Sequence, residues 1–149
     1  MDAVIFIGLQ GAGKSTFYKE RFFSTHMRIN LDMLKTRNRE SSFLQACIET
    51  RQRFVVDNTN PTRAERKVYI QTAKQAGFRV VGYYFQSKVE ECHRRNLQRP
   101  AEQQIPLLGI RGTSGRLEIP SKDEGFDELY YVRIDEANRF VVEEWKGEI

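Results

Sequence analysis

The chain has 149 residues, a formal net charge of +4 and a sequence pI near 9.2. This length predicts one domain over residues 1–149, with a single core and no room for a second catalytic domain. The positive charge is too small to require a polyanionic partner, although it permits one.

Cysteine and histidine are too sparse to predict a metal cluster or a disulfide framework. Cys47 and Cys92 have neither C-x-x-C nor zinc-ligand spacing, so we interpret both as small core residues. His26 and His93 are isolated from each other along the chain. The first apolar run has only five residues, which predicts neither a signal peptide nor a membrane span and favours a reducing, cytoplasmic location.

The first motif is a glycine-rich loop between an expected strand and an expected helix. Ala3–Ile7 is a continuous apolar run typical of a buried parallel strand, and residues 14–23 can form a helix. Between them, Gly8–Ser15 fits the phosphate-binding pattern G-x-x-x-x-G-K-S/T at every fixed position. A chance glycine turn is disfavoured by these flanking elements.

The phosphate-binding loop, residues 8–15, predicts the chemistry of a nucleotide site. Glycines let successive N–H groups face phosphate oxygens at the positive end of the helix. Lys14 would reach the β- and γ-phosphates, and Ser15 would hold Mg²⁺. The expected ATP-binding residues here are Gly8, Gly11, Ala12, Gly13, Lys14, Ser15 and Thr16.

A second short strand, Met27–Ile29, is expected to lead into a loop that contains Asp32. Loops at the carboxyl ends of parallel strands carry the ligands of α/β sheets. Asp32 could therefore accept the proton of an attacking hydroxyl, or it could be a helix N-cap or turn residue. Its position alone favours neither interpretation.

An amphipathic helix is expected from Ser41. Its apolar positions are Phe43, Leu44, Cys47 and Ile48, and Glu40, Glu49 and Arg51 fall off that face.

The strand Arg53–Val56 ends in a polar run, residues 57–61. Asp57 at the strand end is a candidate metal ligand, directly or through water. Asn58, Thr59 and Asn60 could hydrogen-bond a substrate beside it, although these residue types also favour a simple turn.

Two capping boxes are expected next. Thr62 to Glu65 begins a helix that runs to Ala76, and after the strand 78–85 a second box, Ser87 to Glu90, begins another helix. That helix carries Arg95 and Arg99 four residues apart, on one face, where they could grip phosphate oxygens or simply face solvent.

The stretch 101–120 contains three glycines and Pro106. We expect it to be mobile, with at most a short helix near residues 102–107, and to form part of a lid over residues 90–120. A β-hairpin, residues 128–134 and 139–145, would end the sheet.

Together these features resemble the kinase domain of polynucleotide 5′-hydroxyl kinases. Residues 57–61 look like the corresponding run of animal-type repair enzymes, and Arg95-Asn96-x-x-Arg99 looks like the lid helix of the phage enzyme. The resemblance implies a P-loop kinase fold: three α/β/α layers, a mainly parallel sheet of about five strands, a helical lid and a C-terminal hairpin.

The same resemblance implies roles for individual residues. Asp32 would be the general base for a nucleic acid 5′-hydroxyl, and Arg99, assisted by Arg95, would stabilise the transferring phosphoryl group of ATP. The phage arginine that binds an acceptor phosphate corresponds here to Lys35, which keeps the charge without the bidentate fork.

Two other functions stay open from the sequence. Residues 105–129 also resemble the tail of a wide set of small bacterial predicted kinases with largely unassigned substrates, so the acceptor could be a small-molecule hydroxyl. A regulatory nucleotide switch without phosphotransfer is the third possibility, which a base and an arginine lid disfavour.

Overall fold

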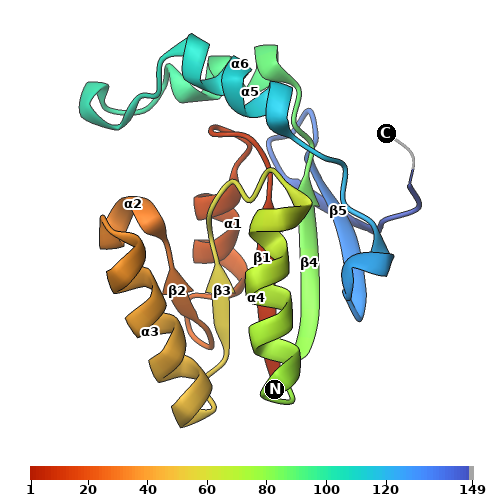
Figure 1. The fold of residues 1–149 in the computed structure, drawn as a ribbon. Helices are drawn as coiled ribbons and strands as arrows, with labels where there is room; N and C mark the ends of the chain where they lie inside the picture. The colour runs from red at the N-terminus through yellow and green to blue at the C-terminus, as the bar shows by residue number, and fades with distance from the viewer. Residues whose placement is uncertain (148–149) are drawn as a thin grey trace.

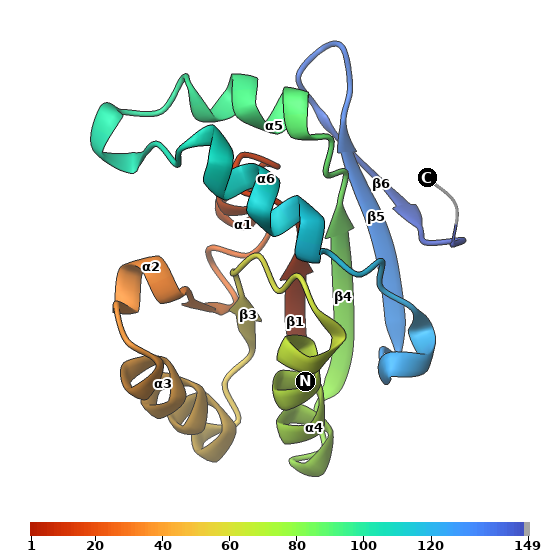
Figure 2. The ribbon, with the colours of Figure 1, turned by 45° about the horizontal axis from the view of Figure 1, so that its top comes forward.

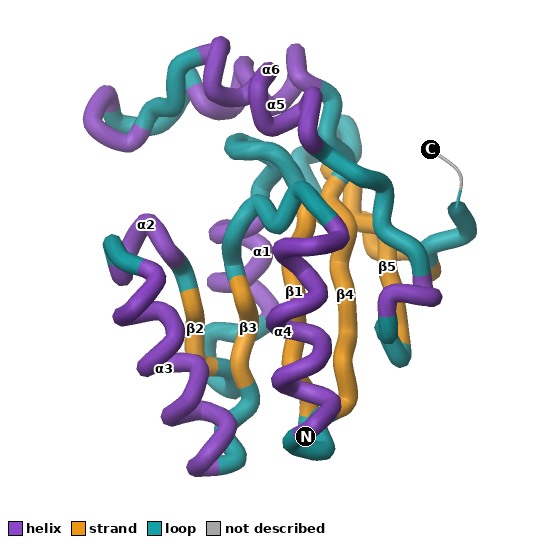
Figure 3. The backbone as a smooth tube through the Cα atoms, in the orientation of Figure 1, coloured by secondary structure: helices purple, strands orange, loops and turns teal. Residues whose placement is uncertain are grey.

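The computed structural model of the protein describes residues 1–147, and its centre is a six-stranded sheet in the order β2-β3-β1-β4-β5-β6. The first five strands in this order are parallel, and β6 runs antiparallel to β5. Figure 3 draws the strands in orange between the purple helices. The strands are β1 (Asp2–Ile7), β2 (Met27–Ile29), β3 (Phe54–Val56), β4 (Arg79–Phe85), β5 (Glu128–Ile134) and β6 (Phe140–Glu144).

Helices cover both faces of the sheet (Figure 1). α3 (Arg37–Thr50) and α4 (Arg63–Gln75) pack on one face, and α1 (Lys14–Arg21) packs on the other. Each face has its own apolar cluster, with Ile5 and Ile7 of β1 in one and Val4 and Phe6 in the other. This burial on both sides explains why β1 is continuously apolar rather than alternating.

Two further helices lie above the carboxyl ends of the strands. α5 (Val89–Asn96) and α6 (Leu107–Arg116) run side by side there, joined through a short 3₁₀ turn, η1 (Ala101–Gln103) (Figure 2). We call residues 89–116 the α5–α6 segment. Cys92 and Ile110 anchor it to the cluster on the α1 side. Two short elements complete the chain, α2 (Leu31–Leu34) and the 3₁₀ turn η2 (Lys122–Glu124).

The short helix expected near residues 102–107 is wrongly placed, because the helix of this stretch is α6, which has ten residues and begins at Leu107. Pro106 precedes it with a φ of −56°, which suits a helix start. Ile110 and Thr113 are buried three residues apart on the face toward the rest of the protein. Gly112 and Gly115 have open space where a Cβ would lie. Tertiary packing thus outweighs the low helix propensity of glycine.

The capping box expected at Ser87 is also wrong. α5 begins at Val89, after Lys88, without a side-chain cap. The Ser87 hydroxyl instead donates to the carbonyl of Phe85 at 2.7 Å and accepts the N–H of Leu9 at 3.2 Å. Ser87 therefore supports the phosphate-binding loop rather than the helix.

A buried ion pair fixes the segment after β3. Arg66 of α4 is fully buried and donates to both carboxylate oxygens of Glu124, at 2.8 and 3.1 Å. Its remaining nitrogen donates to the carbonyls of Asn60 and Pro61 at 2.9 and 3.2 Å. This arginine connects the polar run after β3 with the return of the chain from α6.

Arg66→Met should therefore destabilise the protein strongly, because the buried Glu124 carboxylate would lose its two hydrogen bonds from Arg66. Among the described residues it would keep only one cationic partner, Arg63, at the longer distance of 3.8 Å. We expect a loss of about 3 to 5 kcal/mol in the free energy of unfolding, measured by urea denaturation. Arg63→Met is the matched control, since Arg63 pairs at the surface with Asp123 at 2.9 Å and approaches Glu124 only to 3.8 Å, so it should matter far less. Equal losses in the two variants would contradict this account.

Candidate active site

The phosphate-binding loop curls through two left-handed glycines into the start of α1. Gly11 has φ 83° and Gly13, the residue before α1, has φ 99°. A Cβ on Gly11 would lie 2.3 Å from the carbonyl oxygen of Cys92, so α5 leaves no space for a side chain there. No side chain caps the first turn of α1, which leaves its N–H groups available to an anion.

Lys14 lies inside this curl. Its ammonium group donates to the carbonyls of Gly8 and Leu9 at 2.9 and 2.7 Å. Burial lowers the pKa of Lys14 to about 8; the carboxylates of Asp57 and Asp32 oppose this lowering, and Arg99 adds to it. The charges of three other predicted site residues thus act on the pKa of Lys14.

This pKa predicts how ATP affinity depends on pH. Below about pH 8 Lys14 is protonated and can pair with phosphate, whereas above it the free protein must take up a proton on binding. The dissociation constant for ATP should therefore be flat from pH 7 to 8 and rise toward about tenfold per pH unit above that.

Calorimetric titration with ATP from pH 7 to 10 measures this dependence. Lys14→Met is the control, which should bind weakly and without the rise. An affinity of the wild type that stays constant over the whole range would contradict a protonated Lys14 as the phosphate partner.

Ser15 and Asp57 meet at the first turn of α1. The Ser15 hydroxyl donates to the Asp57 carboxylate at 3.1 Å, and Asp57 is only 1% exposed. A hydroxyl and a carboxylate are hard oxygen donors that suit Mg²⁺. Within residues 1–147 no group of three His, Cys, Asp or Glu side chains could hold a metal ion. The donors therefore fit an ion that takes most of its remaining ligands from phosphate and water.

Asp32 lies on a turn that is tied directly to the end of β3. Asn30, not Asp32, caps α2: its side chain accepts from the N–H of Met33 at 2.9 Å and donates to the carbonyl of Asp57 at 2.6 Å. Asn58 accepts the N–H of Leu31 at 2.9 Å. Asp32 itself is exposed in the first turn. The backbone around this carboxylate is thus fixed while its side chain stays accessible.

The polar run after β3 uses much of its hydrogen-bonding capacity within the protein. Asn60 is buried and donates to the carbonyl of Phe6 at 2.7 Å, and the carbonyl of Thr59 accepts the N–H of Gly8 at 3.0 Å. Asn58 donates to Glu40 at 2.8 Å. Substrate contacts by these three residues stay a prediction, and their observed contacts hold the phosphate-binding loop, Asp57 and the Asp32 turn together.

Sequence reasoning missed Glu40. The prediction that it lies off the buried face of its helix is wrong: Glu40 is buried and also accepts from the hydroxyl of Tyr69 at 2.7 Å and from Arg37 at 3.0 Å. Phe43, assigned to the apolar face, is half exposed instead. Arg37 lies on the same helix, but Tyr69 and Asn58 come from α4 and from the loop after β3, so the local sequence does not signal the burial.

Arg95 lies on α5, but Arg99 lies three residues beyond the end of this helix. The prediction that one helix carries both lid arginines is therefore wrong, because the chain leaves the helix ahead of Pro100. Arg95 donates to the carbonyl of Gly11 at 3.3 Å and lies 3.8 Å from Glu91. Arg99 is partly buried and has no ion pair among the described residues. Lys35 is exposed at the end of α2, with φ 76°, and has no ion pair among residues 1–147 either. Both cations keep their charge available for a ligand.

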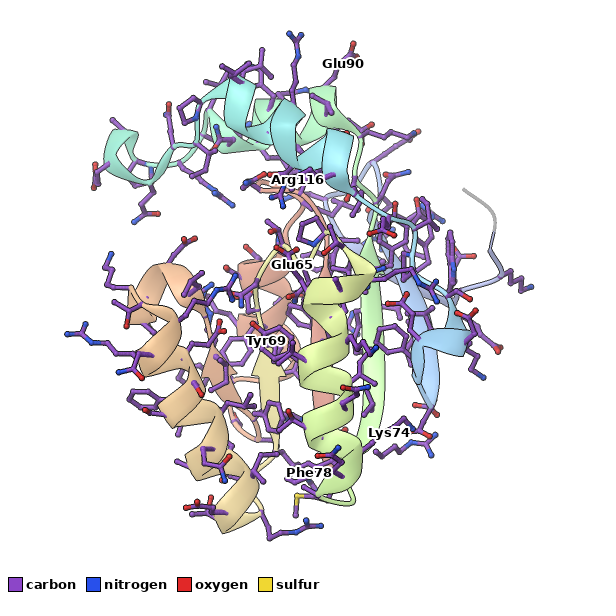
Figure 4. The ribbon with its side chains drawn as sticks, viewed as in Figure 1. Glu65, Tyr69, Lys74, Phe78, Glu90 and Arg116 are labelled. Atoms are coloured by element: carbon purple, nitrogen blue, oxygen red, sulfur yellow. The ribbon has the colours of Figure 1, made fainter. Side chains whose placement is uncertain are left out.

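The α5–α6 segment also contacts the rest of the protein through α6. Gln10 of the phosphate-binding loop donates to Thr113 at 3.0 Å. Figure 4 shows Arg116 directed toward Glu65 of α4, and the two side chains are 3.7 Å apart. The α5–α6 segment therefore contacts both the phosphate-binding loop and α4.

Comparisons with known proteins give both a family and a fold. A family model described as an AAA domain (AAA_33) matches residues 4–111. The bifunctional polynucleotide phosphatase/kinase of Schizosaccharomyces pombe is 30% identical over 132 residues, which cover 84% of this chain and 32% of that protein. The chain thus spans about a third of the length of this relative.

Two solved structures resemble the chain over most of its length. A gluconokinase from Sinorhizobium meliloti 1021 is 19% identical with a TM-score of 0.62, and the match covers 89% of this chain and 82% of that one. Chaetomium thermophilum Kti12 in complex with ADP-AlF3 is 18% identical with a TM-score of 0.67, covering 91% and 92%. These likenesses confirm the predicted P-loop kinase-like fold.

A helix that spans a membrane must be both long and predominantly apolar. Over residues 1–147, the helices are too short or too polar for any of them to cross a lipid bilayer.

Proposed function

The chain belongs to the AAA domain family AAA_33, and from this premise we propose that it is a polynucleotide kinase. In this proposal it transfers the γ-phosphate of ATP to the 5′-hydroxyl of a DNA or RNA end. The acceptor class is supported by the relative from Schizosaccharomyces pombe, whose name includes polynucleotide kinase activity.

The observation that carries the proposal is the attachment of the Asp32 turn to the backbone of Asp57, the candidate metal ligand. Asn30 connects this turn to the Asp57 carbonyl at 2.6 Å, and Asp57 accepts from Ser15 of the phosphate-binding loop. Asp32, a potential general base, thereby has a fixed backbone next to the ATP site. Catalysis by positioning of the reactants requires such a fixed group. A site that only bound nucleotide would need no exposed carboxylate held in this way.

Each residue then has a stated task. Asp32 orients the acceptor hydroxyl and takes its proton as the oxygen attacks the γ-phosphorus and ADP leaves. Lys14 and the loop N–H groups hold the phosphates, and Arg95 and Arg99 neutralise charge on the group in transfer. Mg²⁺ would be held by Ser15 and, directly or through water, by Asp57, where it would neutralise phosphate charge. Residues 90–120 would be the lid that excludes water, and Lys35 would contact an acceptor phosphate.

A substrate panel tests the acceptor. The protein is incubated with γ-labelled ATP and Mg²⁺, together with DNA and RNA oligonucleotides that carry either a 5′-hydroxyl or a 5′-phosphate, and with gluconate as a small-molecule hydroxyl. We expect label on the 5′-hydroxyl oligonucleotides alone. Label on gluconate alone would establish a small-molecule kinase instead, and ADP formation or nucleotide binding without any labelled acceptor would indicate a switch.

A further inference from the structure

Arg28 on β2 contacts both side chains that are expected to hold Mg²⁺, and the proposed mechanism gives it no task. Its Nε donates to the Asp57 carboxylate at 2.8 Å, and its Nη2 donates to the Ser15 hydroxyl at 2.9 Å. The same carboxylate oxygen of Asp57 accepts from Ser15. Arg28, Ser15 and Asp57 therefore form one closed hydrogen-bonded group.

The burial of Asp57 requires a cation nearby. Asp57 is 1% exposed, and an isolated carboxylate at such depth is strongly unfavourable. Arg28 is the only cation within ion-pair distance of Asp57 among the described residues. Its guanidinium group supplies the positive charge that Mg²⁺ would otherwise bring.

Arg28 is held in place from two sides. The strand β2 pairs with β3 along its length, with Arg28 opposite Val55. The guanidinium lies 6.0 Å from the centre of the Tyr18 ring, and the Tyr18 hydroxyl is itself bonded to the carbonyl of His26 at 2.6 Å. Arg28 is still 26% exposed, so its side chain has solvent into which it can move.

We propose that Arg28 is a resident counter-cation that neutralises Asp57 in the metal-free protein and competes with Mg²⁺ for the Ser15–Asp57 pair. A guanidinium 2.9 Å from the oxygen that would bind the metal places two positive charges close together. Bound Mg²⁺ and the observed position of Arg28 therefore oppose each other. This inference rests on the donor half of the proposed function and does not depend on the acceptor.

The first test measures thermal stability in EDTA and in Mg²⁺ with ADP. Arg28→Met should lower the melting temperature in EDTA by roughly 6 to 12 °C, because Asp57 loses its counter-charge. Mg²⁺ and ADP should restore most of this loss. Arg79→Met is the matched control, since Arg79 is also a strand arginine with a carboxylate partner at 2.8 Å, Glu128, but lies at the other end of the sheet. Any change in the melting temperature of Arg79→Met should be the same in EDTA and in Mg²⁺ with ADP.

The second test measures the Mg²⁺ dependence of ADP binding by calorimetry. Arg28→Met should bind Mg²⁺ in the ADP complex at least about fivefold more tightly than the wild type, the range of a modest coupling between two ligands. Arg28→Lys, which keeps a cation, should stay close to the wild type. An unchanged or weaker Mg²⁺ affinity in Arg28→Met would overturn the competition.

Two further outcomes are decisive. If Arg28→Met does not fold, the double variant R28M/D57N should fold, because it removes both charges. A double variant that stays unfolded would overturn the counter-cation role of Arg28. If the wild type binds neither Mg²⁺ nor ADP, the proposed function fails. The stability in EDTA then still decides whether Arg28 neutralises Asp57.

Discussion

Arg99→Ala should lower the rate of phosphoryl transfer by about 10³- to 10⁵-fold, the range seen when an arginine that neutralises the transferring phosphoryl group is lost. Arg99 has no ion pair among the described residues, yet its charge acts on Lys14 inside the phosphate-binding loop. We expect ATP affinity to change far less than turnover, because the loop and Lys14 hold most of the phosphate charge. Single-turnover transfer and equilibrium ATP binding, measured side by side, separate the two effects.

Arg94→Ala is the control for this prediction. Arg94 lies on α5, five residues before Arg99, and faces solvent, so its removal tests the general loss of positive charge from the α5–α6 segment. It should leave transfer close to the wild type. Normal turnover in Arg99→Ala, or an equal loss in both variants, would remove Arg99 from the mechanism.

Asp32→Asn should retain ATP binding and lower transfer by about 10² to 10⁴-fold, the usual worth of a positioned general base. The substitution keeps the size of the side chain, and the turn is fixed by Asn30 and Asn58 rather than by Asp32. The structure of the turn should therefore survive. Transfer at saturating ATP and acceptor, together with the melting temperature, checks both halves of this expectation.

Two controls sharpen the Asp32 experiment. Asp135→Asn removes a carboxylate from the β5–β6 turn, where it accepts the N–H of Arg139 at 2.9 Å, and should not slow transfer. Asp32→Glu keeps the carboxylate but moves it by one methylene, and should fall between the wild type and Asp32→Asn. Full transfer by Asp32→Asn would place the base on another residue.

The elements that sequence predicted well are those with a local signal. The strand–glycine loop–helix unit, the capping box at Thr62 and the buried run of β1 each depend on neighbouring residues, and all three are confirmed. The position of α6 was predicted poorly for the opposite reason. This helix is set by contacts of Ile110 and Thr113 with distant parts of the chain, which no local pattern reveals.

The same distinction applies to the candidate site. The phosphate-binding loop, Asp57 and Arg99 could be named from motifs and from resemblance. Arg28 could not, because an arginine within a three-residue strand has no pattern, and only the fold brings it to Ser15 and Asp57. Glu40 was missed for the same reason, since its partners Asn58 and Tyr69 lie 18 and 29 residues away.

The most direct test of the central claim is the position of the transferred phosphate. A 5′-hydroxyl oligonucleotide is incubated with the protein, γ-labelled ATP and Mg²⁺, and the product is then digested to 5′-mononucleotides. We predict that all label is recovered in the mononucleotide from the 5′ end and that a phosphatase acting on ends removes it before digestion. An oligonucleotide that stays unlabelled while ATP is consumed, or label at any other position, would contradict the assignment of this protein as a polynucleotide 5′-hydroxyl kinase.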